Sequence, residues 1–137
     1  YDISLGLVGS EMCIRDSYQR LLIPVARAFK PELIMVSAGI DIHADDPLGA
    51  MKVNPAGFAG LTRLLMDIAR QTCGGRVVFC LEGGYHADAL ADSALAMIDE
   101  LTGRTSTDVN AMAAGADPGR LNPIVDRCIH THRRFWR

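Results

Sequence analysis

The stretch ELIMVSAGIDIHADDPLG, residues 32–49, joins a continuous apolar run to a loop rich in acidic side chains. The apolar part, ELIMVSAG, has the length of a buried strand, and uninterrupted apolar strands are typical of parallel sheets that are covered on both faces. The loop after it contains Asp41, His43, Asp45 and Asp46. Ligands of open α/β sheets gather at the carboxyl ends of the strands, so this loop is a candidate binding site.

Helices and strands are expected to alternate on both sides of this stretch. Apolar spacing and turn residues predict three helices, over 18–30, 54–73 and 86–103, and a second strand over 76–85. A loop-like segment is expected over 104–119, followed by a last helix from Asn122 to the His130 region. This order is typical of parallel strands joined by right-handed crossovers. The predicted fold class is therefore α/β, with a partial parallel sheet and flanking helices, because two strands alone do not make a stable parallel sheet.

The middle helix has the clearest end signals. Asn54 has the side chain of an N-cap, Pro55 suits the first helical position, and Gly74–Gly75 are expected to end the helix. In the helix over 18–30, Pro24 either lies in the first turn or bends the helix. Apolar side chains at helical spacing define the expected buried faces of the three helices: Leu21, Leu22, Val25, Ala26 and Phe29 in the first; Phe58, Leu61, Leu64, Leu65 and Ile68 in the second; Ala87, Leu90, Ala94, Met97, Ile98 and Leu101 in the third.

The composition is that of an ordinary globular domain, with 137 residues of which 49% are hydrophobic and 22% are charged. The formal net charge of −2 argues against a general electrostatic attraction to nucleic acid or to anionic membranes. No apolar run approaches the roughly 18 residues of a membrane span, and no signal peptide is evident. The basic end HTHRRFWR, residues 130–137, is either a solvated helix face or a binding patch.

The four cysteines, Cys13, Cys73, Cys80 and Cys128, form no Cys-x-x-Cys pair, so neither a zinc knuckle nor a disulfide framework is expected. Cys80 lies within the second predicted strand, where a thiol is expected to be buried as a small apolar side chain. A reducing, cytoplasmic location is the simplest expectation.

The beginning of the chain differs in character from the rest. Leu7–Ser17, LVGSEMCIRDS, has no helical or strand periodicity, and it resembles the translated end of a transposase-based sequencing adapter. Residues 1–17 are therefore expected to be a non-native segment, and residues 18–137 the C-terminal part of a domain. A native loop is the alternative.

Each polar residue of the acidic loop has a structural and a chemical interpretation. The Asp41 carboxylate could ligate a divalent metal, or it could be a turn or N-cap acid. His43 could take part in such a site, or it could be a partly exposed loop histidine hydrogen-bonded to a neighbour. Asp46 precedes Pro47 and could simply shape the turn in DDPLG.

The second loop with candidate chemistry is EGGY, residues 82–85, at the end of the second strand. Gly83 and Gly84 allow backbone angles that other residues resist, and they could bring Tyr85 close to a ligand. A tyrosine hydroxyl there could donate a hydrogen bond to a developing oxyanion. A strand-end turn with a packed tyrosine is the structural alternative. One crossover helix separates the two strands, so the two loops are expected to lie close together.

Two segments carry a family resemblance: FKPELIMVSAGIDIHADDPLGAMKVNPAGFAGLTRLLMDIA (29–69), followed by GGRVVFCLEGGYHADALADSALAMIDEL (74–101). In this order they resemble the C-terminal part of the histone deacetylase superfamily. The resemblance is to its bacterial class II-like and acetylpolyamine amidohydrolase branch. The resemblance implies the arginase/deacetylase-like α/β fold. It also implies roles for single residues: Asp41 as a zinc ligand, Tyr85 as the catalytic tyrosine, and Gly83, Gly84, His43 and Asp46 as supporting the site.

A deacetylase of this family would use Zn2+ to hydrolyse acetyl amides of lysine or of polyamines, with a histidine base and with Tyr85 as the oxyanion donor. The family's separate Asp-x-His pair, which supplies two zinc ligands, and its His-His dyad are absent from this sequence. Since a catalytic zinc needs about three protein ligands, the chain alone is expected to be inactive, and the activity is expected of the intact gene product. Two alternatives stay open: a non-catalytic α/β binding or regulatory module derived from the same fold, and an unrelated α/β enzyme such as a methyltransferase.

Overall fold

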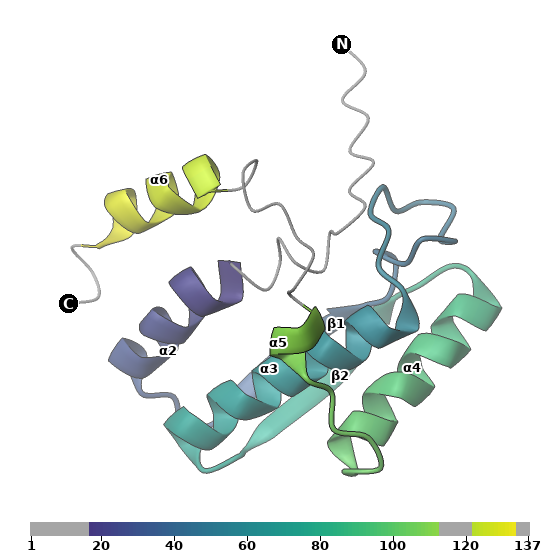
Figure 1. Cartoon of the computed structure of the whole chain (residues 1–137), viewed down its shortest axis with the longest axis horizontal. Coiled ribbons are helices and arrows are strands. Elements are labelled where there is room, and N and C mark those ends of the chain that lie inside the picture. The colour runs from purple at the N-terminus through teal and green to yellow at the C-terminus, as the bar shows by residue number, and fades with distance from the viewer. Residues whose placement is uncertain (1–16, 113–121, 134–137) are drawn as a thin grey trace.

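A computed structural model describes residues 17–112 and 122–133 of the chain (Figure 1). Its elements are, in chain order, the π-helical turn η1 (Tyr18–Leu22), α2 (Ile23–Phe29), β1 (Ile34–Gly39), α3 (Pro55–Cys73), β2 (Val77–Gly83), α4 (Ala87–Leu101), α5 (Val109–Met112) and α6 (Asn122–His132). Figure 1 shows α3 in front of the two strands, with α2 and α4 on either side of it. Cys13, nearly all of the predicted non-native segment and the end of the basic tail lie outside the described residues.

Strands β1 and β2 form a parallel pair, as the sequence predicts. Their register pairs Ile34 with Val77 and Gly39 with Gly83, with an irregularity after Ala38. Because α3 connects the two strands and both run in the same direction, their carboxyl ends lie at the same edge of the sheet. The two candidate loops leave the sheet at this edge.

Helix α3 begins and ends where the sequence predicts. The Asn54 side chain accepts the Gly57 N–H at 2.8 Å, which satisfies a free donor of the first turn, and Pro55 occupies the first helical position. Gly74 ends the helix in the left-handed region, with a φ of 63°. Four side chains of the predicted face are buried, and Leu61 is half-buried.

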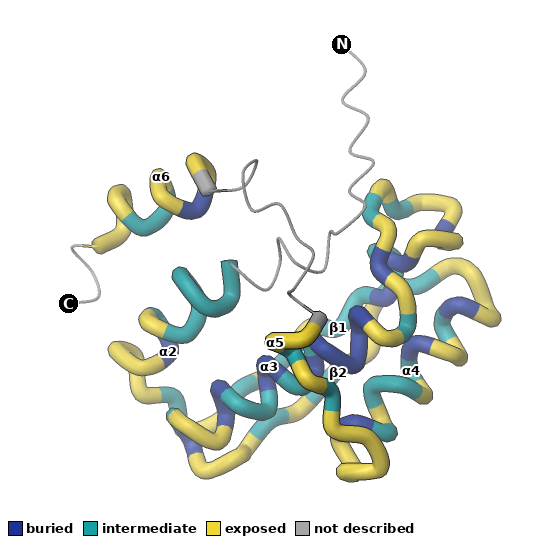
Figure 2. Tube along the Cα trace, viewed as in Figure 1, coloured by how far each residue is buried: buried dark blue, intermediate teal, exposed yellow. Residues whose placement is uncertain are grey.

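The described core consists of two apolar clusters, and both include residues of α3. Figure 2 shows buried residues in dark blue along this helix. One cluster packs Ala26 of α2 against Ile68 of α3. The other packs Ile40 and Val53 against Phe58 at the start of α3. Ile40 comes directly before the acidic loop, so this second cluster gives the loop a fixed base. None of the helices in the described ranges combines the length and the hydropathy that a bilayer span requires.

The described elements cover only one face of the two-stranded sheet. Val36 and Phe79 pack toward α3, whereas Met35 is 70% exposed and Val78 is 44% exposed on the other face. Successive side chains of a strand point to opposite faces, so helices on one side bury only every second residue. Strands that are apolar on both sides thus leave one face exposed in the described part of the chain, as suits a partial sheet. The expectation of a buried Cys80 is wrong, because Cys80 is exposed.

Two predicted helical faces differ from the structure. The predicted helix over 18–30 is a π-helical turn followed by α2, with Pro24 in the first turn of α2, and Phe29 is 80% exposed. Helix α4 packs Leu90, Ala94 and Met97 of its predicted apolar face against the second core cluster. The other members of that face, Ala87, Ile98 and Leu101, are exposed, and the fully buried residues of α4 are Ala89, Ser93 and Glu100. The short α5 lies within the predicted loop, and the predicted last helix is confirmed as α6.

Glu100 is a buried carboxylate that joins the end of α4 to the segment after it. It accepts hydrogen bonds from the Thr105 hydroxyl at 2.9 Å, from the Thr107 hydroxyl at 2.8 Å and from the Thr107 N–H at 3.1 Å, and Arg63 lies 3.4 Å away. Burial by itself raises the pKa of Glu100, but these donors together outweigh it and hold the pKa below its ordinary value.

A charge-removing substitution at this position is expected to give a pH-dependent loss of stability. Because the folded-state pKa of Glu100 is lowered, its stabilising effect is complete above the unfolded pKa of about 4.3 and is lost as the pH falls through the folded value. Glu100→Gln should therefore lower the free energy of unfolding at neutral pH, and its difference from the parent chain should shrink in acid. Urea unfolding at several pH values measures this, and a difference independent of pH would contradict it.

Candidate functional site

The Asp41 carboxylate lies over the carboxyl ends of both strands. A Cβ atom built on Gly39 would come within 2.7 Å of its Oδ1 atom, and one built on Gly83 would come within 3.0 Å of its Oδ2 atom. The Ile40 N–H donates to the Gly83 carbonyl at 2.8 Å, which extends the strand pairing up to this point. Two glycines, one from each strand, thus provide the space in which Asp41 sits.

The acidic loop is held by its own backbone against the second core cluster. The His43 N–H donates to the Ile40 carbonyl at 3.0 Å, and the Ala44 N–H donates to the Val53 carbonyl at 2.9 Å. The Val53 N–H in turn donates to the Ile42 carbonyl at 3.1 Å. Since Ile40 and Val53 are almost fully buried, the loop that carries Asp41 is anchored at both of its ends.

His43 points into the interior instead of toward a ligand. It is buried, and its ring stacks on Phe58 with the ring centroids 6.3 Å apart. Its Nδ1 atom accepts the Asp45 N–H at 3.0 Å and is therefore already engaged within the loop. The expectation of a partly exposed histidine is wrong, and the expectation of a hydrogen bond to a neighbour is confirmed.

Asp46 joins the acidic loop to the glycine loop. Its Oδ1 atom accepts the N–H groups of Leu48 and Gly49 at 2.9 and 3.1 Å, and its Oδ2 atom accepts the Tyr85 N–H at 2.7 Å. Burial by itself raises the pKa of Asp46, but the three N–H groups and the charge of His86 outweigh it and lower the pKa below its ordinary value. Asp46 therefore shapes its own turn and also contacts the second loop.

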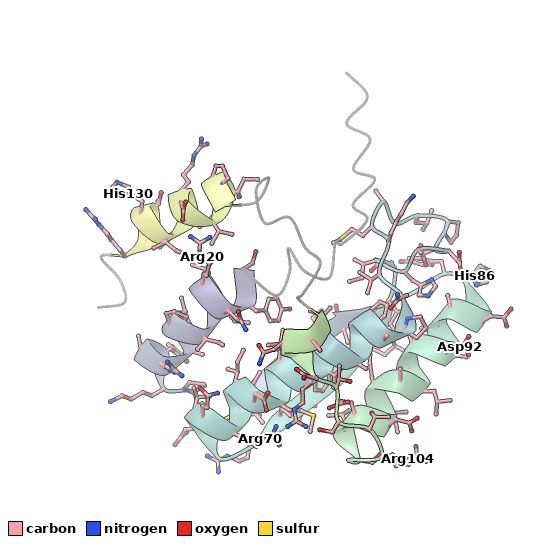
Figure 3. The ribbon with its side chains drawn as sticks, viewed as in Figure 1. Arg20, Arg70, His86, Asp92, Arg104 and His130 are labelled. Carbon is pink, nitrogen blue, oxygen red and sulfur yellow. The ribbon has the colours of Figure 1, made fainter. Side chains whose placement is uncertain are left out.

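Gly84 and Tyr85 form the turn between β2 and α4. Gly84 has a φ of 135°, and a Cβ atom there would lie 2.8 Å from Leu90 Cδ1, so only glycine fits without strain. The Tyr85 residue is 61% exposed, which contradicts the alternative of a packed tyrosine. His86 caps α4 by accepting the Ala89 N–H at 3.3 Å, and Figure 3 shows it beside the acidic loop.

The described residues do not make a complete metal site. Within 17–112 and 122–133, no three His, Cys, Asp or Glu side chains are grouped so that they could hold an ion. Asp41 is the candidate ligand among them, whereas a catalytic zinc needs about three protein ligands. A cavity of about 110 Å³ lies beside β1 and is mostly apolar, with Val36, Phe58 and Leu65 in its lining together with Ile40 and Ile42 on either side of Asp41. It lies within the packing between the sheet and α3.

Comparison with known proteins identifies the family. The model of the histone deacetylase domain matches residues 9–101. The chain belongs to the histone deacetylase family. The resemblance inferred from the two sequence motifs is thereby confirmed. The matched range includes part of the segment 1–17, whose non-native origin stays a prediction.

The relatives of known sequence include histone deacetylases and polyamine deacetylases. Histone deacetylase 15 of Arabidopsis thaliana is 34% identical over 133 residues, which are 97% of this chain and 23% of that protein. Polyamine deacetylase HDAC10 of Homo sapiens is 46% identical over 87 residues, which are 64% of this chain and 12% of that protein. The chain therefore spans a quarter or less of the length of these two relatives.

Solved structures of the family confirm the fold class. The crystal structure of the HDA15 HD domain matches with a TM-score of 0.73 and 30% identity, over 92% of this chain and 33% of that chain. The structure of the histone deacetylase Clr3 matches with a TM-score of 0.77 and 29% identity, over 93% of this chain and 20% of that chain. The two-stranded sheet and its helices are thus a part of the α/β deacetylase fold.

Proposed function

We propose that this chain is the C-terminal part of a zinc-dependent deacetylase that hydrolyses N-acetyl amides of lysine or of polyamines. Membership of the histone deacetylase family supports the activity. The observation that carries the proposal is the meeting of the two candidate loops at one edge of the sheet, where Asp46 accepts the Tyr85 N–H at 2.7 Å and Asp41 lies against Gly83.

In this proposal two side chains contact the reacting groups. Asp41 is one metal ligand, and the Tyr85 hydroxyl donates a hydrogen bond to the oxyanion that forms when the acetyl carbonyl is attacked, an effect of about 3 kcal/mol on the barrier. The exposure of Tyr85 leaves its ring free to turn toward a substrate. Gly83 and Gly84 let the backbone make this turn, and His43 holds the loop from inside.

The zinc ion would need further ligands. Asp41 alone does not fit a catalytic zinc site, so the other protein ligands and the histidine base would come from a part of the domain other than residues 17–112 and 122–133. We therefore expect no turnover by the chain alone.

The described cysteines bear on the location of the protein. Cys73, Cys80 and Cys128 are unpaired thiols, which supports a reducing compartment such as the cytoplasm, although two relatives are named as chloroplastic.

A chimera tests the proposal. In this chimera, residues 18–133 of the chain replace the matching part of the A. thaliana HDA15 deacetylase domain. We expect the zinc-loaded chimera to release acetate from an acetyl-lysine peptide or from an acetylated polyamine, and the ratio of kcat/KM for the two substrates assigns the class. Asp41→Asn in the chimera should abolish turnover. A chimera that folds and binds zinc like the HDA15 domain but is inactive would contradict the proposal and favour a non-catalytic module.

A further inference from the structure

One carboxylate connects the two loops of the candidate site. Asp46 is 7% exposed, and both of its oxygens accept hydrogen bonds from backbone N–H groups. Two of the donors, Leu48 and Gly49, belong to its own loop, whereas the third, Tyr85, is 39 residues further along the chain. A buried side chain that caps only its own turn would not need this third contact.

The Gly49 contact extends this network toward Asp41. A Cβ atom built on Gly49 would come within 1.7 Å of the Asp41 carbonyl oxygen, so the Gly49 backbone lies directly against the Asp41 backbone. Asp46 holds Gly49 in that place through the 3.1 Å hydrogen bond to its N–H. One carboxylate therefore fixes the backbone next to Asp41 with one oxygen and the backbone of Tyr85 with the other.

The Asp46 carboxylate holds the Tyr85 backbone at its N–H group. The Tyr85 side chain is 61% exposed and so does not lock the residue by packing. It follows two glycines, whose backbones have more freedom than those of other residues. The Asp46 Oδ2 atom thus holds the Tyr85 backbone in place between the end of β2 and the first turn of α4.

We propose that Asp46 is a positioning residue that sets the distance and orientation between Asp41 and Tyr85. The inference rests on the proposed deacetylase function for its catalytic consequence. An ionised carboxylate suits this role, because its two oxygens accept all three N–H groups. An asparagine has one carbonyl oxygen and one NH2 donor, so it can satisfy its own turn or the Tyr85 N–H, but not both.

Amide hydrogen exchange in the full 137-residue chain tests the structural part. In Asp46→Asn we expect the Tyr85 amide to exchange about ten-fold faster or more, while amides in α3 keep their protection. The matched control is Asp108→Asn, because Asp108 also accepts two backbone N–H groups, from Asn110 at 2.9 Å and from Ala111 at 3.0 Å. Exchange at Tyr85 that equals that of the parent chain overturns the proposal, and so does a uniform loss of protection throughout the chain.

Kinetics of the chimera test the catalytic part. Asp46→Asn should lower kcat by about ten-fold or more with KM changed about two-fold or less, since the groups that react are displaced while substrate binding is kept. Asp108→Asn should change neither constant. Equal kcat values for Asp46→Asn and the unsubstituted chimera overturn the positioning role. If the unsubstituted chimera is inactive, the proposed function fails, and the exchange at Tyr85 still decides whether Asp46 holds that residue.

Discussion

Tyr85→Phe is expected to lower the kcat of the chimera by about 10²–10³-fold, because it removes one hydrogen-bond donor to the oxyanion. KM should change little, since the ring that contacts the substrate remains. The substitution should not unfold the protein, because the Tyr85 side chain is largely exposed and its N–H keeps the hydrogen bond to Asp46. Steady-state kinetics with an acetyl-lysine peptide, together with a thermal unfolding curve, measure both effects.

The matched control for this substitution is Tyr18→Phe. Tyr18 lies in the first turn of the described chain and lines the cavity beside β1, where burial raises its pKa, and it belongs to neither of the two loops. Its hydroxyl should not affect kcat. If Tyr85→Phe keeps the full kcat, or if both substitutions reduce it equally, the assignment of Tyr85 as the oxyanion donor is wrong.

Ile68→Ala is expected to destabilise the chain by about 2–5 kcal/mol, which is the usual range for deleting a large buried aliphatic side chain. Ile68 is 1% exposed and lies where α2, α3 and both strands meet, so the surrounding side chains cannot collapse into the space that it leaves. Stabilities of whole domains are typically only about 5–15 kcal/mol, so this loss should remove a large share of the stability of the chain and lower its urea midpoint clearly. Urea unfolding followed by circular dichroism measures the loss.

The control for Ile68→Ala is the same change at Ile98, which is 48% exposed on α4. Removing a side chain that is half in solvent should cost far less, within about 0.5–1 kcal/mol. Losses of equal size at the two positions would show that the core does not lie between α2, α3 and the sheet.

The sequence predicts best those features that depend on neighbouring residues. Asn54 and Pro55 start α3 and Gly74 ends it, because caps and proline act within one turn of the helix. The parallel pairing of β1 and β2 also follows from local patterns, since a strand–helix–strand order leaves few other topologies. Those local signals placed Asp41 and Tyr85 on neighbouring strand ends.

Features that depend on distant contacts were not predicted. An apolar strand does not reveal which of its faces will be covered, so Cys80 was expected inside but is exposed. Helix α4 buries Glu100, because Thr105, Thr107 and Arg63 satisfy its charge, and helical periodicity treats such a residue as solvent-facing.

Within the site, sequence reasoning found the residues but not how they are held. The bond between Asp46 and Tyr85 crosses 39 residues, and no local pattern encodes it. The burial of His43 against Phe58 is a tertiary contact of the same kind. Gly39 was missed as the residue that makes room for the Asp41 carboxylate, although a glycine two positions before a candidate ligand is a signal that could have found it.

The sheet face that the described residues leave exposed has a consequence for the fate of the chain in a cell. Exposed apolar strands with unpaired edges are what chaperones and proteases of the quality-control machinery engage, and they also promote aggregation. Because Met35 and Val78 face solvent within the described residues, this sheet face should escape that fate only when another protein surface or another part of the same domain covers it.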